Sequence, residues 1–541
     1  MKISRRSFLG LSAGLPVAVG LGCSDADELH DPGDGWKRGP LSHLLPAVTA
    51  TGVVVKASFV APLASAPRLA IGDREVVGEQ QDTSGRFFAF RAGGLAPAMR
   101  YRLQLFAGAD PLCEAWPLST LPAPDAQPER LRVASFTCAG GIEVPSPPGL
   151  FHPFKPAAWR RRLFDLILAQ EPDLVIANGD HVYFDLPAMA RVQSSWLGGL
   201  LVPFVEGLHA HFDPGREVLG TPNETALTTV GDDQIARIYG VRFRSTPIYF
   251  VTDDHDYFIN DDATPEGTTL PPSRFHAALR NALQRLYLPE LPGDGLPVDV
   301  PGRIGSAKLA LSTHFGEVRY GDLLSLLIYD CGGYLSLGPG AGLVPAAVER
   351  WLIDRTLTED TRHLVHVPSH PMGWTAGKWR EWYPDFLEST GSVVAAVERD
   401  EAGHKFMWQP GWWRQHQALI AAIARQKQRS GLVVSGDLHA LGALRIERSG
   451  DIDLSAAPVY TILAGSAGTG DVGWPSRARG VTPRIADALV AEALLDLDER
   501  NGFTQMDLDR GAARVRTFGA PRAYVPPPAL VLQPALELEL G

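Results

Sequence analysis

The chain has 541 residues, of which 45% are hydrophobic, so it can bury a large core and exceeds the usual size of one domain. Its formal net charge is −11, and no basic stretch follows the first few residues. Because gripping nucleic acid through its phosphates requires clustered lysine and arginine, this excludes a stable nucleic-acid partner, although nucleic acid could still be a substrate.

The N-terminus has the pattern of an export signal. Arg5 and Arg6 precede the apolar run 8–22, which is too short to cross a bilayer comfortably. The order Ser-Arg-Arg-Ser-Phe-Leu resembles a twin-arginine signal, whose translocation machinery would then be a partner during export; an ordinary secretory leader is the alternative. We expect residues 1–30 to be a signal peptide, the protein to be periplasmic or extracellular, and Cys23 to be a candidate for lipid attachment.

Residues 40–125 are predicted to form a small all-β sandwich. Alternating side chains over 53–59 and 87–90 are typical of strands. The stretch 94–103, with a Leu-x-Pro turn leading into Tyr-x-Leu, resembles the turn before the penultimate strand of fibronectin-type sandwiches. The proline-rich segment 121–127 closes this domain.

From residue 128 to 541, short apolar strands alternate with amphipathic helices, which favours an α/β fold with mixed sheets. Strands are predicted at 131–136, 173–178, 248–251, 364–367 and 432–435, and helices at 157–170, 344–357 and 413–428. The Pro- and Gly-rich stretches near 185–230 and 264–305 are predicted to be loops or insertions over one face.

Nearly every predicted strand of the second domain ends in side chains that can bind a metal. The clusters are Thr137-Cys138, Gly179-Asp-His-Val-Tyr183, Asp253-Asp-His-Asp256, His366 with His370, and Gly436-Asp-Leu-His439. Each cluster alone has a structural explanation as a turn or as packing. Because loops at the carboxyl ends of strands converge on one crevice in α/β sheets, their common position favours a shared site.

A phosphoester hydrolase needs a hydroxide at neutral pH and positive charge beside phosphorus, and two adjacent metal ions supply both. Asp180 is the candidate bridging carboxylate because the preceding glycine permits a tight turn, and Tyr183 can return to the same ion. Thiolate and phenolate ligands favour Fe(III). An oxygen-rich half with Asp180, Asp254 and Asp437 favours a harder divalent ion such as Ca²⁺, Mn²⁺ or Mg²⁺.

These motifs resemble the PhoD-type alkaline phosphatases of the calcineurin-like metallophosphoesterase superfamily, in the same order along the chain. The matching stretches are Ser-Phe-Thr-Cys138, Gly179–Tyr183 for the G-D-x-x-Y signature, Asp253–Asp256 with Asn260-Asp261 for the D-D-H-E block, and Gly436–His439 for the G-D-x-H motif. The resemblance covers the β-sandwich and almost the whole second domain. It implies a four-layer sandwich of two mixed β-sheets flanked by helices, and hydrolysis of phosphomonoesters or phosphodiesters by metal-bound hydroxide.

The resemblance also implies a role for each matching residue. The iron site would use Cys138, Asp180, Tyr183 and His439, and the second site would use Asp180, Asp254 and Asp437. His255 would be the catalytic residue beside the phosphate, as a general acid or an electrostatic partner, and Asn260 would also bind substrate. Independently of the family, a histidine next to a metal-bound aspartate is not expected to reach the same ion, so His255 should face the substrate.

Three features depart from the family pattern. Asp256 stands where glutamate is usual, which could alter the support of His255. His370 resembles the strand-end histidine of the wider superfamily and is either a metal ligand or structural, whereas His366 lies inside an apolar strand and is interpreted as packing. The block 329–334 has no arginine where PhoD-type enzymes show Asp-x-Arg, so the phosphate anchor is not identified.

Two other functions stay open. One is a phosphodiesterase or nucleotidase resembling purple acid phosphatases, with a dinuclear site. The other is a non-catalytic surface-binding protein that retains its metal site for stability and uses the β-sandwich as its working part. We expect a monomer that acts on small-molecule phosphoesters.

Overall fold

The computed structural model describes residues 34–143, 154–184, 211–257, 272–306, 309–337, 340–377, 381, 406–426, 428–470, 476 and 481–541. The predicted signal peptide with Cys23 lies outside these residues, and so does Asn260. Among the described helices, none combines the length and the apolar composition that a membrane span requires.

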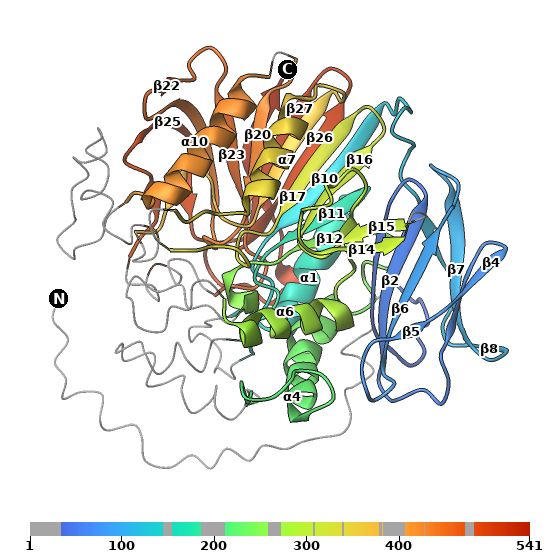
Figure 1. Ribbon diagram of the computed structural model, residues 1–541. Coiled ribbons are helices and arrows are strands. Elements are labelled where there is room, and N and C mark those ends of the chain that lie inside the picture. The colour runs from blue at the N-terminus through green and yellow to red at the C-terminus, as the bar shows by residue number, and fades with distance from the viewer. Residues whose placement is uncertain are drawn as a thin grey trace, which may run out of the picture.

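The N-terminal strands form two sheets, coloured blue in Figure 1. The first runs in the order β1 (Leu41–Val48), β2 (Gly52–Phe59), β6 (Phe87–Gly93) and β5 (Glu79–Gln80). The second contains β4 (Arg74–Val77), β3 (Arg68–Ile71), β7 (Arg100–Ala107), β8 (Asp110–Pro111) and β9 (Trp116–Ser119). The hydroxyl of Tyr101 accepts a hydrogen bond from the backbone N–H of Ala96 at 2.8 Å, which fixes the turn that resembled a fibronectin-type sandwich.

The following part of the chain contains two larger mixed sheets. The six-stranded sheet has the order β12 (Ile248–Val251), β11 (Leu174–Asn178), β10 (Arg130–Phe136), β26 (Gly502–Asp509), β27 (Ala513–Gly519) and β28 (Gln533–Leu540). The eight-stranded sheet has the order β16 (Phe315–Tyr320), β17 (Leu324–Tyr329), β18 (His363–Pro368), β20 (Gly431–Ser435), β23 (Val459–Ala464), β21 (Leu441–Ser449) and β22 (Ile452–Asp453), and β25 (Leu489–Asp498) pairs with β21. Smaller pairings involve β13 (Leu291–Pro292), β14 (Arg303–Ser306), β15 (Leu309–Ser312), β19 (Trp374–Thr375) and β24 (Arg484–Ile485).

Side chains of the buried strands point alternately to opposite faces of their sheet, which places each sheet between two apolar cores. In β11, Ile176 lies in the core between the two large sheets, whereas Val175 and Ala177 lie in the core under helix α1 (Ala157–Leu168). Helices α7 (Ala346–Leu357) and α10 (Pro410–Ala424) cover the outer face of the eight-stranded sheet (Figure 1). The result is a helix–sheet–sheet–helix sandwich, which confirms the predicted fold class.

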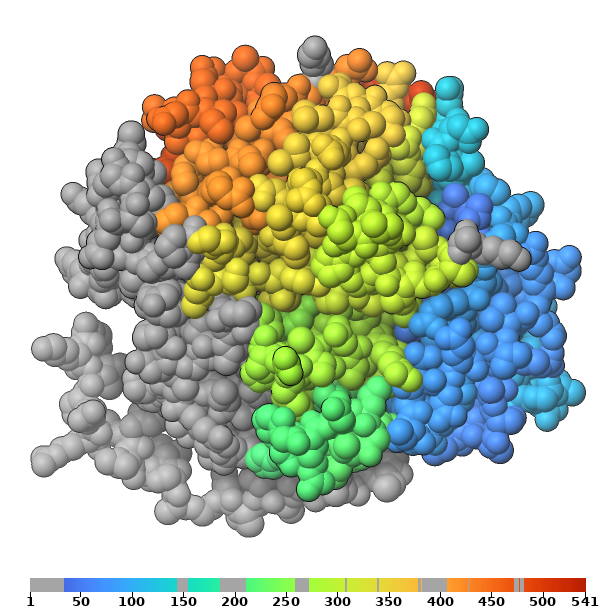
Figure 2. Space-filling view, viewed as in Figure 1, coloured from blue at the N-terminus to red at the C-terminus, as the bar shows by residue number. Residues whose placement is uncertain are grey.

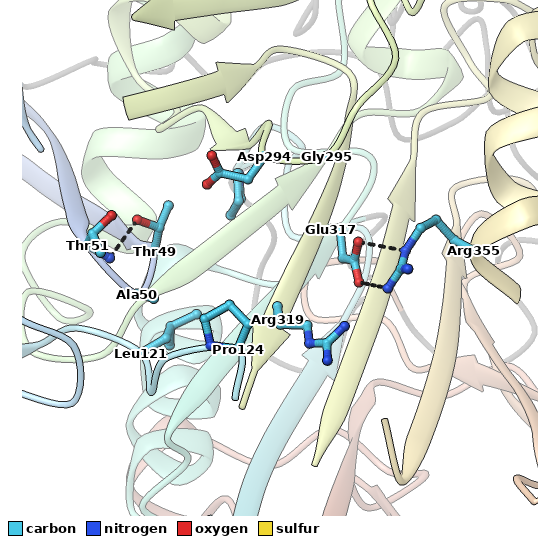
Figure 3. Close-up of a pocket in the computed structure, with 11 residues that line it drawn as sticks. Thr49, Ala50, Thr51, Leu121, Pro124, Asp294, Gly295, Glu317, Arg319 and Arg355 are labelled. Carbon is cyan, nitrogen blue, oxygen red and sulfur yellow. Dashed lines mark hydrogen bonds and ion pairs between the residues drawn. The ribbon is translucent and has the colours of Figure 1, made fainter. Parts of the chain in front are cut away.

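The N-terminal sheets pack firmly against the rest of the protein (Figure 2). One apolar core contains residues of both parts, and the Tyr249 hydroxyl donates a hydrogen bond to the carbonyl of Val48 at 2.8 Å. The buried Lys56 ammonium pairs with Glu290 at 2.8 Å. A cavity of about 490 Å³ lies at this junction, with the Glu317–Arg355 ion pair in its wall (Figure 3); none of the metal ligands predicted from the sequence is among the described residues that line it.

The stretches near 185–230 and 264–305, predicted as loops or insertions, contain helices among their described residues. Helix α4 (Pro222–Gly231) is followed by the π-helical turn η1 (Asp232–Ala236) and the short α5 (Arg237–Tyr239), and α6 spans Arg274–Leu286. Thr221 and Ser273 accept hydrogen bonds from the first free N–H groups of α4 and α6. Pro222 needs no acceptor at the start of α4, so the proline begins a helix instead of preventing one.

Candidate metal centre

The candidate ligands lie at the carboxyl ends of adjacent parallel strands. Strands β10, β11 and β12 pair in parallel, and Cys138, Asp180 and Asp253 follow their ends. From the other large sheet, Asp437 and His439 follow β20. The side chain of Asn178 joins the two sheets below the site, since its Nδ2 donates to the carbonyls of Pro368 at 3.1 Å and Val434 at 3.4 Å.

Three groups of buried side chains bring their possible ligand atoms within 4.8 Å of one another. They are Cys138, Asp180 and His439; Asp180, Asp254 and His255; and Asp253, Asp254 and Asp437. Asp180 belongs to the first two groups, and Asp254 belongs to the last two. Adjacent cations could therefore share a carboxylate.

Tyr183 extends the first group. Its hydroxyl donates to Oδ2 of Asp180 at 3.0 Å and lies 3.5 Å from Nε2 of His439. The thiol of Cys138 donates to the same Asp180 oxygen at 3.2 Å. The sequence-predicted members of the first site thus converge on one carboxylate.

The backbone at the site is unusual. Cys138, Asp180, Asp437 and His439 have φ values of 52°, 57°, 67° and 54°, and only two further non-glycine residues of the described ranges have positive φ. Such conformations are costly and persist where the surroundings impose them, often at functional sites. Gly179, with φ 82°, closely approaches Asp253, because a Cβ at 179 would lie 2.6 Å from the aspartate Cβ. The glycine before Asp180 is therefore required.

The donor set suits a cation. Burial raises the pKa of Cys138 well above the usual thiol value, and the nearby Asp180 raises it further. Burial likewise raises the pKa of Asp180 and of Tyr183. Oδ1 of Asp180 is buried and has no hydrogen-bond partner among the described residues. A cation would supply the missing partner and would displace the thiol and phenol protons.

His255 lies closer to the ligand groups than expected. Its ring centre is 4.3 Å from that of Tyr183, and a ring nitrogen lies within 4.8 Å of carboxylate oxygens of Asp180 and Asp254. The expectation that His255 faces the substrate and does not bind the same ion as Asp254 stays a prediction. The chain enters the 3-10 turn η2 (Asp254–Tyr257) here, so successive side chains do not alternate as they would in a strand.

No protein-family model matches this chain, and no curated protein sequence matches it. The solved structure of PhoD is similar over 92% of this chain and 89% of that chain, with a TM-score of 0.56 and 13% sequence identity. The chain has a PhoD-like fold. A dimetal phosphatase from Danio rerio aligns with 76% of this chain and 100% of that chain, with a TM-score of 0.34 and 10% identity.

Within the PhoD-like fold, the two remaining strand-end histidines behave differently. His370 belongs to none of the three ligand groups of the described residues, and its ring packs against Trp412 with centres 5.2 Å apart. Its role as a ligand stays a prediction. His366 contacts the hydroxyls of Thr356 at 2.9 Å and Tyr329 at 3.3 Å, and burial lowers its pKa to about 3. This confirms the interpretation of His366 as a packing residue.

Sequence reasoning missed several residues of the site. Asp253 was noted in its motif but was not assigned as a ligand, although the Asp-Asp pair was a visible signal. The hydroxyl of Thr469 forms a short hydrogen bond with Nδ1 of His439, and Ser466 donates to Thr469 at 2.7 Å. Gln234 of η1 accepts from the N–H groups of Gly141 at 2.7 Å and Tyr183 at 2.9 Å. Nothing in the sequence marks Thr469 or Gln234.

The block 329–334, which has no arginine where PhoD-type enzymes show Asp-x-Arg, contacts residues on either side of the turn after β12. Asp330 accepts hydrogen bonds from Thr252 at 2.7 Å and Tyr257 at 2.5 Å. It also pairs with Arg280 at 3.4 Å, and both side chains are 1% exposed. Arg280 is thus occupied in a buried ion pair with Asp330.

Proposed function

We propose that this protein hydrolyses phosphoesters in a metal-dependent reaction. The observation that carries the proposal is the position of Asp180, whose carboxylate belongs to two neighbouring groups of buried ligand atoms. That arrangement suits two adjacent cations with one bridging carboxylate, which is the arrangement that in-line displacement at phosphorus uses. The PhoD-like fold supports the proposal.

The chemistry of the donors suggests how two cations would divide the site. Cys138, Asp180, Tyr183 and His439 would hold Fe(III), and Asp180, Asp254 and Asp437 would hold a divalent ion, for which we propose Ca²⁺. Asp253 adds a third carboxylate beside Asp254 and Asp437. When bound, the cations would lower the pKa of a bound water and offset negative charge developing on the phosphoryl oxygens.

Residues of the chain would orient the metal ligands and would protonate the leaving oxygen of the substrate. His255 lies against Tyr183 and belongs to the ligand group of Asp180 and Asp254, where an imidazolium N–H can donate a proton to the leaving oxygen. The hydroxyl of Thr469 holds Nδ1 of His439 and leaves Nε2 directed toward Asp180, 3.6 Å from its Oδ2. Cys138 and Tyr183 would act as ligands after losing their protons.

The test uses protein purified without chelators. Metal analysis is followed by assays of a chromogenic phosphomonoester and a phosphodiester across alkaline pH. Iron with calcium, and turnover of either ester, would agree with the proposal. Iron with zinc or manganese would favour the purple-acid-phosphatase-like alternative. No turnover of either ester by metal-loaded protein would overturn the proposed activity and favour the surface-binding alternative.

A further inference from the structure

Asp256 is a buried acidic residue of turn η2 that belongs to none of the ligand groups found among the described residues. Its Oδ1 accepts hydrogen bonds from the backbone N–H groups of His181 and Val182, both at 2.9 Å. Its Oδ2 accepts from the backbone N–H groups of Asp180 and Asp253, both at 3.0 Å. One carboxylate therefore joins the turn after β11 to the turn after β12.

These four N–H groups lie beyond the last paired residues of β11 and β12, Asn178 and Val251, where the strand ladder has ended. A buried N–H without an acceptor is strongly unfavourable, so the turns need an internal partner. An ionised carboxylate offers about four lone-pair sites, and Asp256 directs them at four donors. This occupancy explains why Asp256 supports the turns and is not itself a ligand.

We propose that Asp256 is a positioning residue that sets the distance between Asp180 and the pair Asp253 and Asp254. The proposal rests on the metal centre proposed above. Since the Asp180 carboxylate lies in two ligand groups, a displacement of its turn would disturb both of them. The expectation that Asp256 supports His255 stays a prediction, and the role proposed here in the backbone of two ligand-bearing turns is additional to it.

Two substitutions of Asp256 distinguish the effect of its carboxylate charge from the effect of the position of its carboxylate. Asp256→Asn keeps one acceptor oxygen but places an NH₂ group, which cannot accept, against two of the backbone N–H groups. Asp256→Glu keeps the carboxylate but moves it by about 1.5 Å, the length of one carbon–carbon bond. We expect the wild type to bind metal most tightly, Asp256→Glu less tightly, and Asp256→Asn least tightly.

The chain offers a matched control in its N-terminal sheets. Asp82 is 7% exposed, and its carboxylate accepts hydrogen bonds from the backbone N–H groups of Gly85 at 3.2 Å, Arg86 at 3.0 Å and Phe87 at 3.2 Å. Asp82→Asn removes the same kind of turn support without touching the ligand-bearing turns. It reports how far general destabilisation alone weakens metal binding.

The measurement is the dissociation constant for Zn²⁺, by competition with a chromophoric chelator, in full-length wild type and the three variants. We expect Asp256→Asn to raise this constant about 10- to 100-fold. We expect Asp82→Asn to stay within about threefold of wild type. Asp256→Asn within about threefold of wild type, or an equal loss in Asp82→Asn, would overturn the proposal.

Circular dichroism of the metal-free proteins decides which variant is used. If Asp256→Asn does not fold, Asp256→Glu replaces it: weakening beyond about threefold supports the proposal, and a smaller change overturns it. Binding of Zn²⁺ without hydrolysis by the wild type would contradict only the proposed activity. A wild type that binds no Zn²⁺ would overturn both proposals.

Discussion

The Sγ atom of Cys138 lies 3.2 Å from Oδ2 of Asp180, although 42 positions separate the two residues. The contact exists because β10 and β11 pair in parallel and end at the same edge, and because both residues adopt positive φ. The thiol donates a hydrogen bond to this carboxylate oxygen. A cation that replaces the thiol proton would bind to both atoms at once.

Asp180→Ala is expected to remove both cations together and to lower hydrolysis by at least about 10³-fold, because the shared carboxylate is lost. Metal content by mass spectrometry and turnover of a chromogenic ester measure this. Asp173→Ala is the control, since Asp173 precedes the opposite end of β11 and accepts a hydrogen bond from the Arg132 N–H at 2.7 Å. Retention of either cation by Asp180→Ala would contradict the bridging role.

Thr469→Val is expected to weaken metal binding about 10- to 100-fold while leaving the fold intact, because Nδ1 of His439 loses the hydroxyl that orients its ring. The dissociation constant for Zn²⁺ is the measurement. The matched control is Thr504→Val, since Thr504 is also fully buried but bonds to the Thr517 hydroxyl at 3.2 Å, within the sheet. Equal losses in both variants would point to packing and against orientation of His439.

Arg280→Met is expected to destabilise the metal-free protein by about 3–5 kcal/mol, because it leaves Asp330 buried without its cationic partner. Burial already raises the pKa of Asp330, and Arg280 opposes that rise. Urea unfolding measures the change. The double variant Arg280→Met with Asp330→Asn, which removes the charge but keeps an acceptor oxygen, should recover much of the loss, and a double variant as unstable as the single would refute this account.

Acidification is expected to destabilise the metal-free protein through His366. Burial, reinforced by Arg429, lowers its pKa from 6.5 to about 3 in the folded state. Above pH 6.5, His366 is neutral in both the folded and the unfolded protein, so it does not reduce the free energy of unfolding. Between pH 6.5 and about pH 3, His366 binds a proton in the unfolded chain but not in the folded protein, so the free energy of unfolding falls. The unfolding free energy should fall by about 1.4 kcal/mol per pH unit for this group.

Urea unfolding at several pH values between about 4.5 and 6.5 measures the slope. His366→Gln should reduce it by the contribution of that one proton. An unchanged slope in His366→Gln would show that the acid sensitivity arises elsewhere.

The ends of the strands were predicted well from the sequence because the residues that mark a strand end lie within a few positions of it. The predicted strand at 248–251 coincides with β12, and Gly179 before Asp180 marks a turn that only glycine permits. The convergence of Cys138, Asp180 and His439 was predicted from their common position after strands together with the family resemblance, which assigned them to one site. Apolar periodicity and turn residues are encoded within a few positions, so they can be read without coordinates.

The missed features depend on contacts across the fold. The four backbone bonds of Asp256 link turns about 75 positions apart, and no local pattern announces them. Helix α10 begins at Pro410, not at 413, because proline is well placed in a first turn where periodicity alone gives no signal. The support of His439 by Thr469 likewise requires two distant loops to meet.

The amide of Asn178 has a consequence for ion choice. By tying β11 to the carbonyls that end β18 and β20, it fixes the gap between the half of the centre carried by one sheet and the half carried by the other. The width of that gap is then a property of the polypeptide, which does not relax freely around whichever ion arrives. If the proposed cations bind, these two bonds would resist a change in the width of the gap, so an ion of unsuitable radius would be bound less tightly.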